Sequence, residues 1–150
     1  MNKIDPSKIS IICINIYKSS ITTTETYLNN PVAMSSTKVG FAQETGFNFE
    51  EKKIRIRLNI ALDGVDNKSN TIGLSGEFGF EFQLLVSNLE EFLEKEEEKT
   101  KVNGELGATL MGIIYSTARG IILERTQNTY LRGIILPVID PGIILGSKIE

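Results

Sequence analysis

The sequence predicts an α+β fold, in which a four-stranded antiparallel meander sheet is covered on one face by one long helix. Two patterns lead to this prediction. Apolar and polar residues alternate from Lys53 to Leu62 and from Thr71 to Val86, as they do in strands that bury one face. The run from Gly104 to Arg125 is apolar at helical spacing, and it is long enough to cover such a sheet. With 150 residues, the chain is expected to form one domain, 1–150.

The first strand is expected within KISIICINIYKSSI, from Lys8 to Ile21, because this run is rich in isoleucine. Strict alternation divides its apolar side chains between two faces, with Ile12, Ile14 and Ile16 on one and Ile9, Ile11, Cys13 and Tyr17 on the other. A half-exposed edge strand carries one polar face. The second apolar face is therefore covered either by a helix of this chain or by another subunit, and the pattern leaves both interpretations open.

The second and third strands follow a polar loop, 22–37. The second, from Lys38 to Glu51, places Phe41, Phe47 and Phe49 on one face, and a bulge or bend is expected at Gly46. In the third, five aliphatic side chains point inward: Ile54, Ile56, Leu58, Ile60 and Leu62.

The fourth strand, Thr71 to Val86, follows a turn over residues 63–70 and has the strongest strand pattern. Its apolar residues share one face with Gly76, namely Ile72, Leu74, Phe78, Phe80, Phe82, Leu84 and Val86. Glu77 and Glu81 belong to the opposite, polar face.

A short acidic helix is expected from Ser87 to Lys99, where Ser87 and Glu90 have the spacing of a capping box. Its acidic residues, 94–98, are interpreted as a solvated face rather than a carboxylate site, because lysines alternate with them. The long helix follows, with Asn103 as its N-cap.

Small residues recur at every fourth position of the long helix, at Gly104, Ala108, Gly112, Ser116 and Gly120. Such a stripe allows another backbone to approach closely. The rest of the helix is apolar on almost every side, so it must be covered on most of its surface. A membrane span is not expected, because Arg119 lies inside the run and a central arginine costs about 3 kcal/mol on insertion.

The triplet GII begins at Gly112, Gly120, Gly133 and Gly142. The intervals between these positions have no constant period, so a repeat architecture is excluded. The last two triplets lie in a segment with Pro137 and Pro141, and these prolines prevent a continuous helix.

Several function classes conflict with the composition. The sequence has no histidine and one cysteine, Cys13, so neither a Ser-His or Cys-His nucleophile pair nor a Cys/His zinc site can be assembled from one chain. Phosphate-binding and dinucleotide-binding glycine motifs are missing as well. We therefore expect a protein that is not an enzyme and that binds neither a metal ion nor a cofactor.

The net charge of −3 disfavours binding to nucleic acid, which requires a basic stripe. The N-terminal residues lack the apolar core of a signal peptide, so a cytoplasmic location is expected.

Four strands, a long helix and a proline-bearing apolar segment together resemble the SecB-like protein-export chaperones. The segment that carries the resemblance best is LMGIIYSTARGIILERTQNTYLRGIILPVIDP, from Leu110 to Pro141, and the likeness extends from Ser10 to about Leu145. It implies an ATP-independent holdase that binds unfolded or precursor polypeptides in apolar grooves. It also implies a homo-oligomer, either a dimer or a tetramer formed as a dimer of dimers.

The resemblance also implies roles for individual residues. The implied client-binding residues are Phe41, Phe47, Phe49, Tyr130, Leu131, Ile134 and Ile135. The implied oligomer interface consists of Ile12, Ile14 and Ile16 from the first strand and Gly112, Ser116 and Gly120 from the long helix. Glu77 and Glu81 correspond to the acidic contact with the SecA motor. Extended clients can in addition hydrogen-bond at an exposed strand edge.

The chain departs from the SecB pattern in two places. The expected acidic helix 87–99 is an insertion before the long helix, and the second helix must be truncated because the sequence ends at GIILGSKIE. These departures put delivery to SecA in doubt, and a dedicated client, such as an antitoxin in a toxin-antitoxin system, fits nearly as well. Two other classes stay open: an oligomeric scaffold subunit whose own tail, 133–145, fills the groove, and a small-molecule-binding α+β domain.

Overall fold

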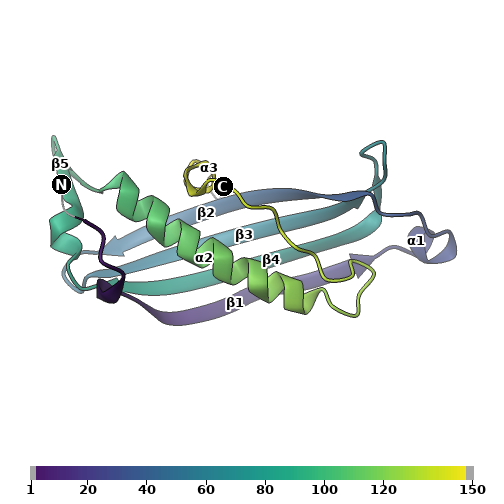
Figure 1. The fold of residues 1–150 in the computed structure, drawn as a ribbon, viewed down its shortest axis with the longest axis horizontal. Helices are drawn as coiled ribbons and strands as arrows, with labels where there is room; N and C mark the ends of the chain where they lie inside the picture. Colours follow the sequence, from purple (N-terminus) through teal and green to yellow (C-terminus); the bar gives the residue numbers. More distant parts are fainter. Residues whose placement is uncertain (1–2, 148–150) are drawn as a thin grey trace.

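The sheet and the long helix form two layers, and the helix crosses the sheet obliquely (Figure 1). The computed structural model describes residues 3–147. The sheet consists of β1 (Ile9–Thr23), β2 (Ser36–Asn48), β3 (Lys53–Val65) and β4 (Thr71–Val86), and the helix is α2 (Gly104–Arg125). This arrangement confirms the predicted α+β fold, with four antiparallel strands covered by one long helix.

The strand order is β1-β4-β3-β2, so the prediction of a simple meander was wrong for the first strand. The strands β2, β3 and β4 follow one another through hairpins, whereas β1 pairs with β4 at the far edge. The connection 24–35 is long enough to pass the end of the sheet, and it contains a short helix, α1 (Glu25–Asn29), within the predicted loop. As a result, β1 and β2 are the two edges of the sheet.

Two bulges in β1 change which of its side chains face the helix. The antiparallel register shifts between Ile11 and Cys13 and again between Ile16 and Lys18. Each extra residue reverses the alternation that follows it. The isoleucines that pair with inward-facing positions of β4 are Ile9, Ile11, Ile14, Ile16 and Ile21. The predicted division of β1 into two apolar faces was therefore wrong, since most of its isoleucines lie on the helix-bearing face.

The central strands β3 and β4 supply the core as predicted. All five aliphatic residues expected to point inward from β3 are buried, and so are Phe78, Phe80 and Phe82 of β4. Each fully buried side chain of this size stabilises the fold by about 1.5–3 kcal/mol. The bulge expected at Gly46 is absent from the described β2–β3 register, which is regular from Ser36 to Asn48.

The helix α2 covers these strands with one stripe. Five of its buried side chains recur at intervals of four residues, namely Leu106, Leu110, Ile114, Ala118 and Ile122, and Met111 and Tyr115 are buried beside them. Asn103 is the N-cap, as predicted, and its side chain accepts hydrogen bonds from the backbone N–H groups of Glu105 and Leu106. The small-residue stripe that contains Ser116 and Gly120 is on the other side of the helix, where these two residues are exposed.

The predicted acidic helix from Ser87 to Lys99 is wrong. A 3-10 turn, η2 (Leu89–Phe92), is followed by a hairpin of β5 (Leu93–Glu96) and β6 (Lys99–Val102). A helix would bring glutamates of residues 94–98 together at spacings of three and four. The hairpin instead pairs Glu94 with Lys101 and Glu96 with Lys99, so opposite charges face each other across the strands.

The segment after α2 returns along the helix on the same side of the sheet (Figure 1). Thr126 directs this return: its fully buried hydroxyl donates to the Ile122 carbonyl and accepts from the Ile134 backbone N–H, at 2.8 and 2.7 Å. A second contact comes from Tyr115, whose hydroxyl donates to the Pro137 carbonyl. The segment contains α3 (Pro141–Leu145), capped by Asp140, and its five residues agree with the very short second helix that the sequence predicts.

Replacing Thr126 with valine is expected to lower the free energy of unfolding by about 1–3 kcal/mol, because the buried Ile134 N–H loses its acceptor. Chemical denaturation of both proteins measures this change. The matched control is Thr117→Val on the same helix. The Thr117 hydroxyl donates only to a helical carbonyl, so a loss of no more than about 0.5 kcal/mol is expected. Equal losses in the two variants would contradict the role assigned to Thr126.

Candidate functional site

An apolar hollow of about 330 Å³ opens on the helix-bearing side, beside the free edge of β2. Its floor is formed by Ile54 and Ile56 of β3, and one wall by the first turns of α2. We call it the edge hollow; the residues that line it are Gln43, Thr45, Phe47, Ile54, Ile56, Thr100, Lys101, Val102, Asn103, Gly104, Gly107, Leu110 and Leu145.

Two glycines of α2 keep the edge hollow open. A Cβ atom at Gly104 would meet no other atom within 4 Å, so this position faces open space. At Gly107 a Cβ would lie 3.7 Å from a Leu145 methyl group. The first turns of α2 therefore present little side-chain bulk to the space above β2 and β3, and an apolar group can approach the core there.

An aromatic pair stands at the rim of the edge hollow. The rings of Phe47 and Phe49 are stacked, with centroids 5.6 Å apart and an interplanar angle of 7°. They remain 42% and 38% exposed, which is high for phenylalanine. Exposed apolar surface beside an apolar depression is typical of a binding site.

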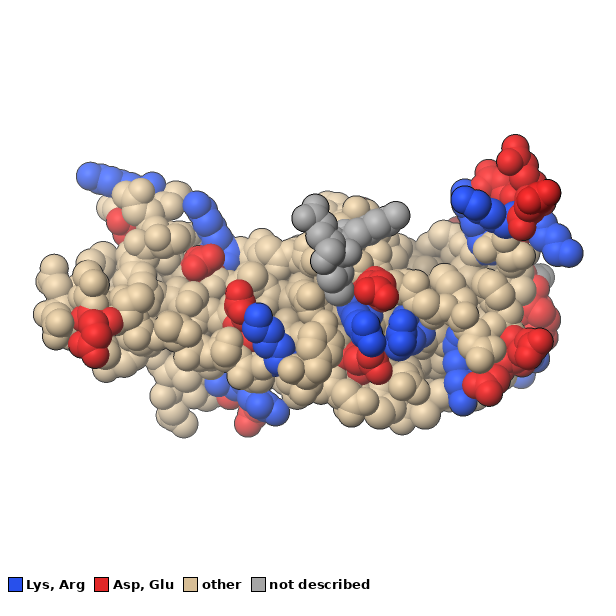
Figure 2. All heavy atoms as spheres, turned by 180° about the vertical axis from the view of Figure 1, so that it is seen from behind, with Lys and Arg blue, Asp and Glu red and all other residues tan. Residues whose placement is uncertain are grey.

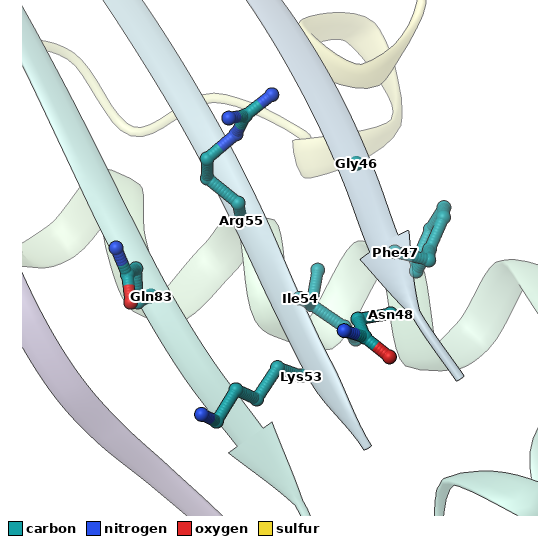
Figure 3. Close-up of a pocket in the computed structure, with 7 residues that line it drawn as sticks. All are labelled: Gly46, Phe47, Asn48, Lys53, Ile54, Arg55 and Gln83. Carbon is teal, nitrogen blue, oxygen red and sulfur yellow. The ribbon is translucent and has the colours of Figure 1, made fainter. Parts of the chain in front are cut away.

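At the same end of the sheet, the outer face carries polar and charged side chains. A hollow of about 290 Å³ there is lined in part by Lys53, Arg55 and Gln83. Figure 3 shows these three polar side chains on neighbouring strands, with Phe47 at the β2 edge. The apolar site and the polar surface are therefore on opposite faces of the same strands.

The structure does not gather the seven predicted client-binding residues into one pocket. Phe47 lies near the C-terminal end of β2 and lines the edge hollow with the first turns of α2, and Phe49 follows directly after the strand. Phe41 is half-buried further along β2, where its ring meets the Tyr115 ring edge-on at 5.6 Å. The remaining four belong to the segment after α2.

Within that segment, Leu131 and Ile134 are buried in the core, with 2% and 7% exposure. Tyr130 packs edge-on against Tyr27 of α1, with ring centroids 5.4 Å apart. Ile135 is 74% exposed. Tyr130 and Ile135 are thus the accessible members of this group, and client binding by any of the seven remains a prediction.

Of the residues that line the edge hollow, the sequence predicted only Phe47 as a binding residue, and the most informative one that it did not predict is Gln43. It is buried at 6% exposure, although it is polar. Its amide nitrogen Nε2 donates to the Leu145 carbonyl at 2.9 Å, and its oxygen Oε1 accepts from the Thr45 hydroxyl at 2.6 Å. The sequence alone contained a sign of this role, because Gln43 occupies an inward position of β2 between Phe41 and Phe47. A polar residue at such a position requires a partner.

The predicted oligomer interface falls on two separate surfaces. At the β1 edge, Ile12 and Ile14 are exposed and Ile16 is half-buried. On the outward side of α2, Ser116 and Gly120 are exposed, whereas a Cβ at Gly112 would lie 3.5 Å from Pro141 of the same chain. The chain itself therefore covers Gly112 in part, and the interface role of all six residues remains a prediction.

Both predicted motor-contact residues lie on the outer face of the sheet and carry ion pairs. Glu77 pairs with Lys18, and Glu81 accepts from Arg57 Nε at 2.9 Å. The hydrogen bond from Arg57 lowers the pKa of the Glu81 carboxyl below its usual range. Seen from this side, basic and acidic groups are interspersed (Figure 2). A SecA contact through Glu77 and Glu81 therefore remains a prediction.

Residues 3–147 contain no group of three or more Cys, Asp or Glu side chains that could hold a metal ion. By length and composition, α2 is the one described helix that could cross a membrane. One side of α2 is buried against the sheet, which is the arrangement of a core helix.

No family model and no curated protein matches this chain. Among solved structures, it is similar to a SecB-like chaperone of Mycobacterium tuberculosis in complex with a ChAD peptide from the HigA1 antitoxin. The TM-score is 0.58 at 12% identity, over 89% of this chain and 91% of the other. This likeness shows a SecB-like fold and does not show membership of the family.

A protein of unknown function from Streptococcus agalactiae is also similar, with 13% identity over 87% of this chain and 97% of the other. Its TM-score is 0.41.

Replacing Gly120 with leucine is expected to weaken the predicted oligomer. Gly120 is exposed, and a Cβ there would meet no other atom of the chain within 4 Å, so a leucine is expected to be tolerated within one chain and to clash with a partner packed on this side. Overpacking costs about 1–3 kcal/mol, which corresponds to a dissociation constant raised about 5- to 150-fold. Light scattering at a series of concentrations measures this change.

The matched control is Gly40→Leu on β2, also a position with no atom within 4 Å of a Cβ but outside the predicted interface. The mass of its oligomer in solution should equal that of the unchanged protein at each concentration. If Gly120→Leu behaves in the same way as this control, the small-residue stripe is not an interface.

Proposed function

We propose that this chain is an ATP-independent holdase chaperone that binds unfolded or precursor polypeptides. The observation that carries the proposal is the apolar edge hollow with its exposed aromatic rim, placed beside a free strand edge on a SecB-like fold. Within the described residues, no metal-binding group points to a different function.

Apolar surface at a strand edge suits clients that share no sequence. Burial of apolar area contributes about 25 cal/mol per Å² whichever apolar side chain supplies it. The exposed N–H and C=O groups of an edge strand bind an extended main chain, which every unfolded polypeptide offers. Because β2 is an edge, it offers both contributions beside the edge hollow, although the Gln43 backbone N–H is bonded to the Ser147 carbonyl of the same chain.

Two observations favour a dedicated client over Sec-dependent export. The similar mycobacterial chaperone was solved with a peptide from an antitoxin, which supports a polypeptide client of that kind. On the outer face, Glu77 and Glu81 are already engaged by Lys18 and Arg57, so a motor protein would have to compete with these ion pairs. An antitoxin is therefore the first client to test, and an exported precursor the second.

The proposed active form is a cytoplasmic homo-oligomer, a dimer or a tetramer. Apolar side chains at the β1 edge support it, since Ile11, Ile12 and Ile14 are 41%, 49% and 38% exposed. Isoleucines that lie side by side along an edge strand are unfavourable in water and are commonly covered by a second subunit.

One observation favours the scaffold alternative, in which the chain fills its own groove permanently. Ile134, Leu136 and Ile144 of the segment after α2 are buried against the rest of the molecule. The edge hollow nevertheless remains open beside Leu145. A scaffold subunit would form the same oligomer and protect no unfolded chain, so the activity measurement separates the two functions.

The purified protein is expected to suppress the aggregation of a chemically unfolded client without ATP, as measured by light scattering. The double variant Phe47→Ser/Phe49→Ser should lower client affinity about 5- to 30-fold, since it removes about 1–2 kcal/mol of apolar contact from two half-exposed rings.

The matched control is Val138→Ser, a change at a residue that is exposed but does not line the edge hollow. It should bind clients as the unchanged protein does. A purified protein that is monomeric and protects no unfolded chain would rule out the holdase function.

A further inference from the structure

The last described residues of the chain occupy one side of the edge hollow. We call residues 141–147, which comprise α3, Gly146 and Ser147, the C-terminal latch. Figure 1 shows α3 above the β2 edge. Within the latch, Ile144 is fully buried and Leu145 lines the edge hollow next to Gly107.

Gln43 of β2 holds the latch through two main-chain carbonyls. Its backbone N–H donates to the Ser147 carbonyl at 3.2 Å, and its side-chain Nε2 donates to the Leu145 carbonyl at 2.9 Å. The Thr45 hydroxyl donates to Gln43 Oε1 and so orients the amide with its nitrogen toward the latch. Both bonds recognise backbone atoms and are independent of the latch sequence.

The Gln43 amide selects the chemistry of whatever covers it. A buried amide nitrogen without an acceptor is destabilising, so when an apolar occupant replaces the latch and excludes water, a carbonyl of that occupant has to replace the one from Leu145. The chemistry needed is therefore a main-chain carbonyl accompanied by an apolar side chain in the edge hollow. An extended polypeptide provides both.

The β2 edge can continue such an interaction beyond Gln43. In an antiparallel strand the N–H and C=O groups of alternate residues point to the same side. The Gln43 N–H points away from β3, toward Ser147. The backbone groups of Phe41, Thr45 and Phe47 therefore face the same free edge, and an extended segment could pair with them.

We propose that the C-terminal latch is an intramolecular competitor of the client. On the holdase function proposed above, an extended client segment displaces the latch, one of its main-chain carbonyls accepts the hydrogen bond from Gln43 Nε2, and one of its apolar side chains enters the edge hollow. The apparent affinity for clients is then the intrinsic affinity multiplied by the fraction of molecules whose latch is open.

The latch is suited to reversible release. It contains a helix of five residues, which is too short to be stable in isolation. Ile143 in the middle of α3 is 67% exposed, so one side of the latch faces water. Its contacts with Gln43 amount to two hydrogen bonds, and a client can supply equivalent ones.

The test compares the affinity of a fluorescently labelled, reduced and carboxymethylated lactalbumin, a permanently unfolded chain, for three proteins. A chain that ends at Asp140 should bind it about fivefold or more tightly than the full chain, because the competitor is gone. Leu145→Glu should act in the same direction, since a carboxylate is disfavoured in the apolar edge hollow, and it keeps the test decisive if the shortened chain folds poorly.

The matched control is Ile143→Glu, which places the same charge on the exposed side of the same helix. Its affinity should equal that of the full chain. In the chain that ends at Asp140, Gln43→Leu should weaken client binding about threefold or more, because the client carbonyl loses its donor.

The outcomes separate this inference from the holdase function. If the full chain binds the unfolded protein and neither the shortened chain nor Leu145→Glu binds it more tightly, the latch is not a competitor and the holdase function stands. If none of the proteins binds the unfolded chain, the holdase function is wrong and the inference is overturned with it.

Discussion

The burial of one apolar sheet face under a single helix is the constraint on which the rest of this structure depends. Side chains of β3 and β4 that include Phe78, Phe80 and Phe82 must be kept from water, and α2 covers them with one buried stripe. Four strands about 4.8 Å apart form a sheet wider than one helix of about 10 Å. The helix therefore covers the centre and leaves both edge strands partly uncovered.

The two uncovered edges differ in chemistry. The β1 edge exposes isoleucines, among them Ile11 and Ile14. Their side chains need only an apolar surface to be buried, which suits a permanent subunit contact. The β2 edge combines the apolar edge hollow with the buried amide of Gln43, which donates to a main-chain carbonyl. This hydrogen bond to a backbone atom makes the β2 edge the more suitable of the two for an exchangeable polypeptide.

The elements that follow a local period could be predicted from the sequence. The inward residues of β3 and β4, the α2 boundaries and the Asn103 cap depend on alternation, helical spacing and local hydrogen bonding. The acidic helix 87–99 could not be ruled out in this way, because its charges gain their partners only when Glu94 and Glu96 face lysines across a hairpin. Likewise, the bulges of β1 depend on its register against β4 and not on its own sequence.

By itself, the sequence determined the fold class, the helix that covers the sheet and the lack of histidine on which the expectation of a non-catalytic protein rests. It named Phe47 and Phe49 as candidates, and these two lie at the rim of the edge hollow. Only the tertiary structure decided that Leu131 and Ile134 are buried and that Gln43 bonds to the carbonyls of Leu145 and Ser147. The physical reason is that burial and hydrogen-bond partners are set by contacts between residues about a hundred positions apart, such as Gln43 and Leu145, which no local pattern encodes.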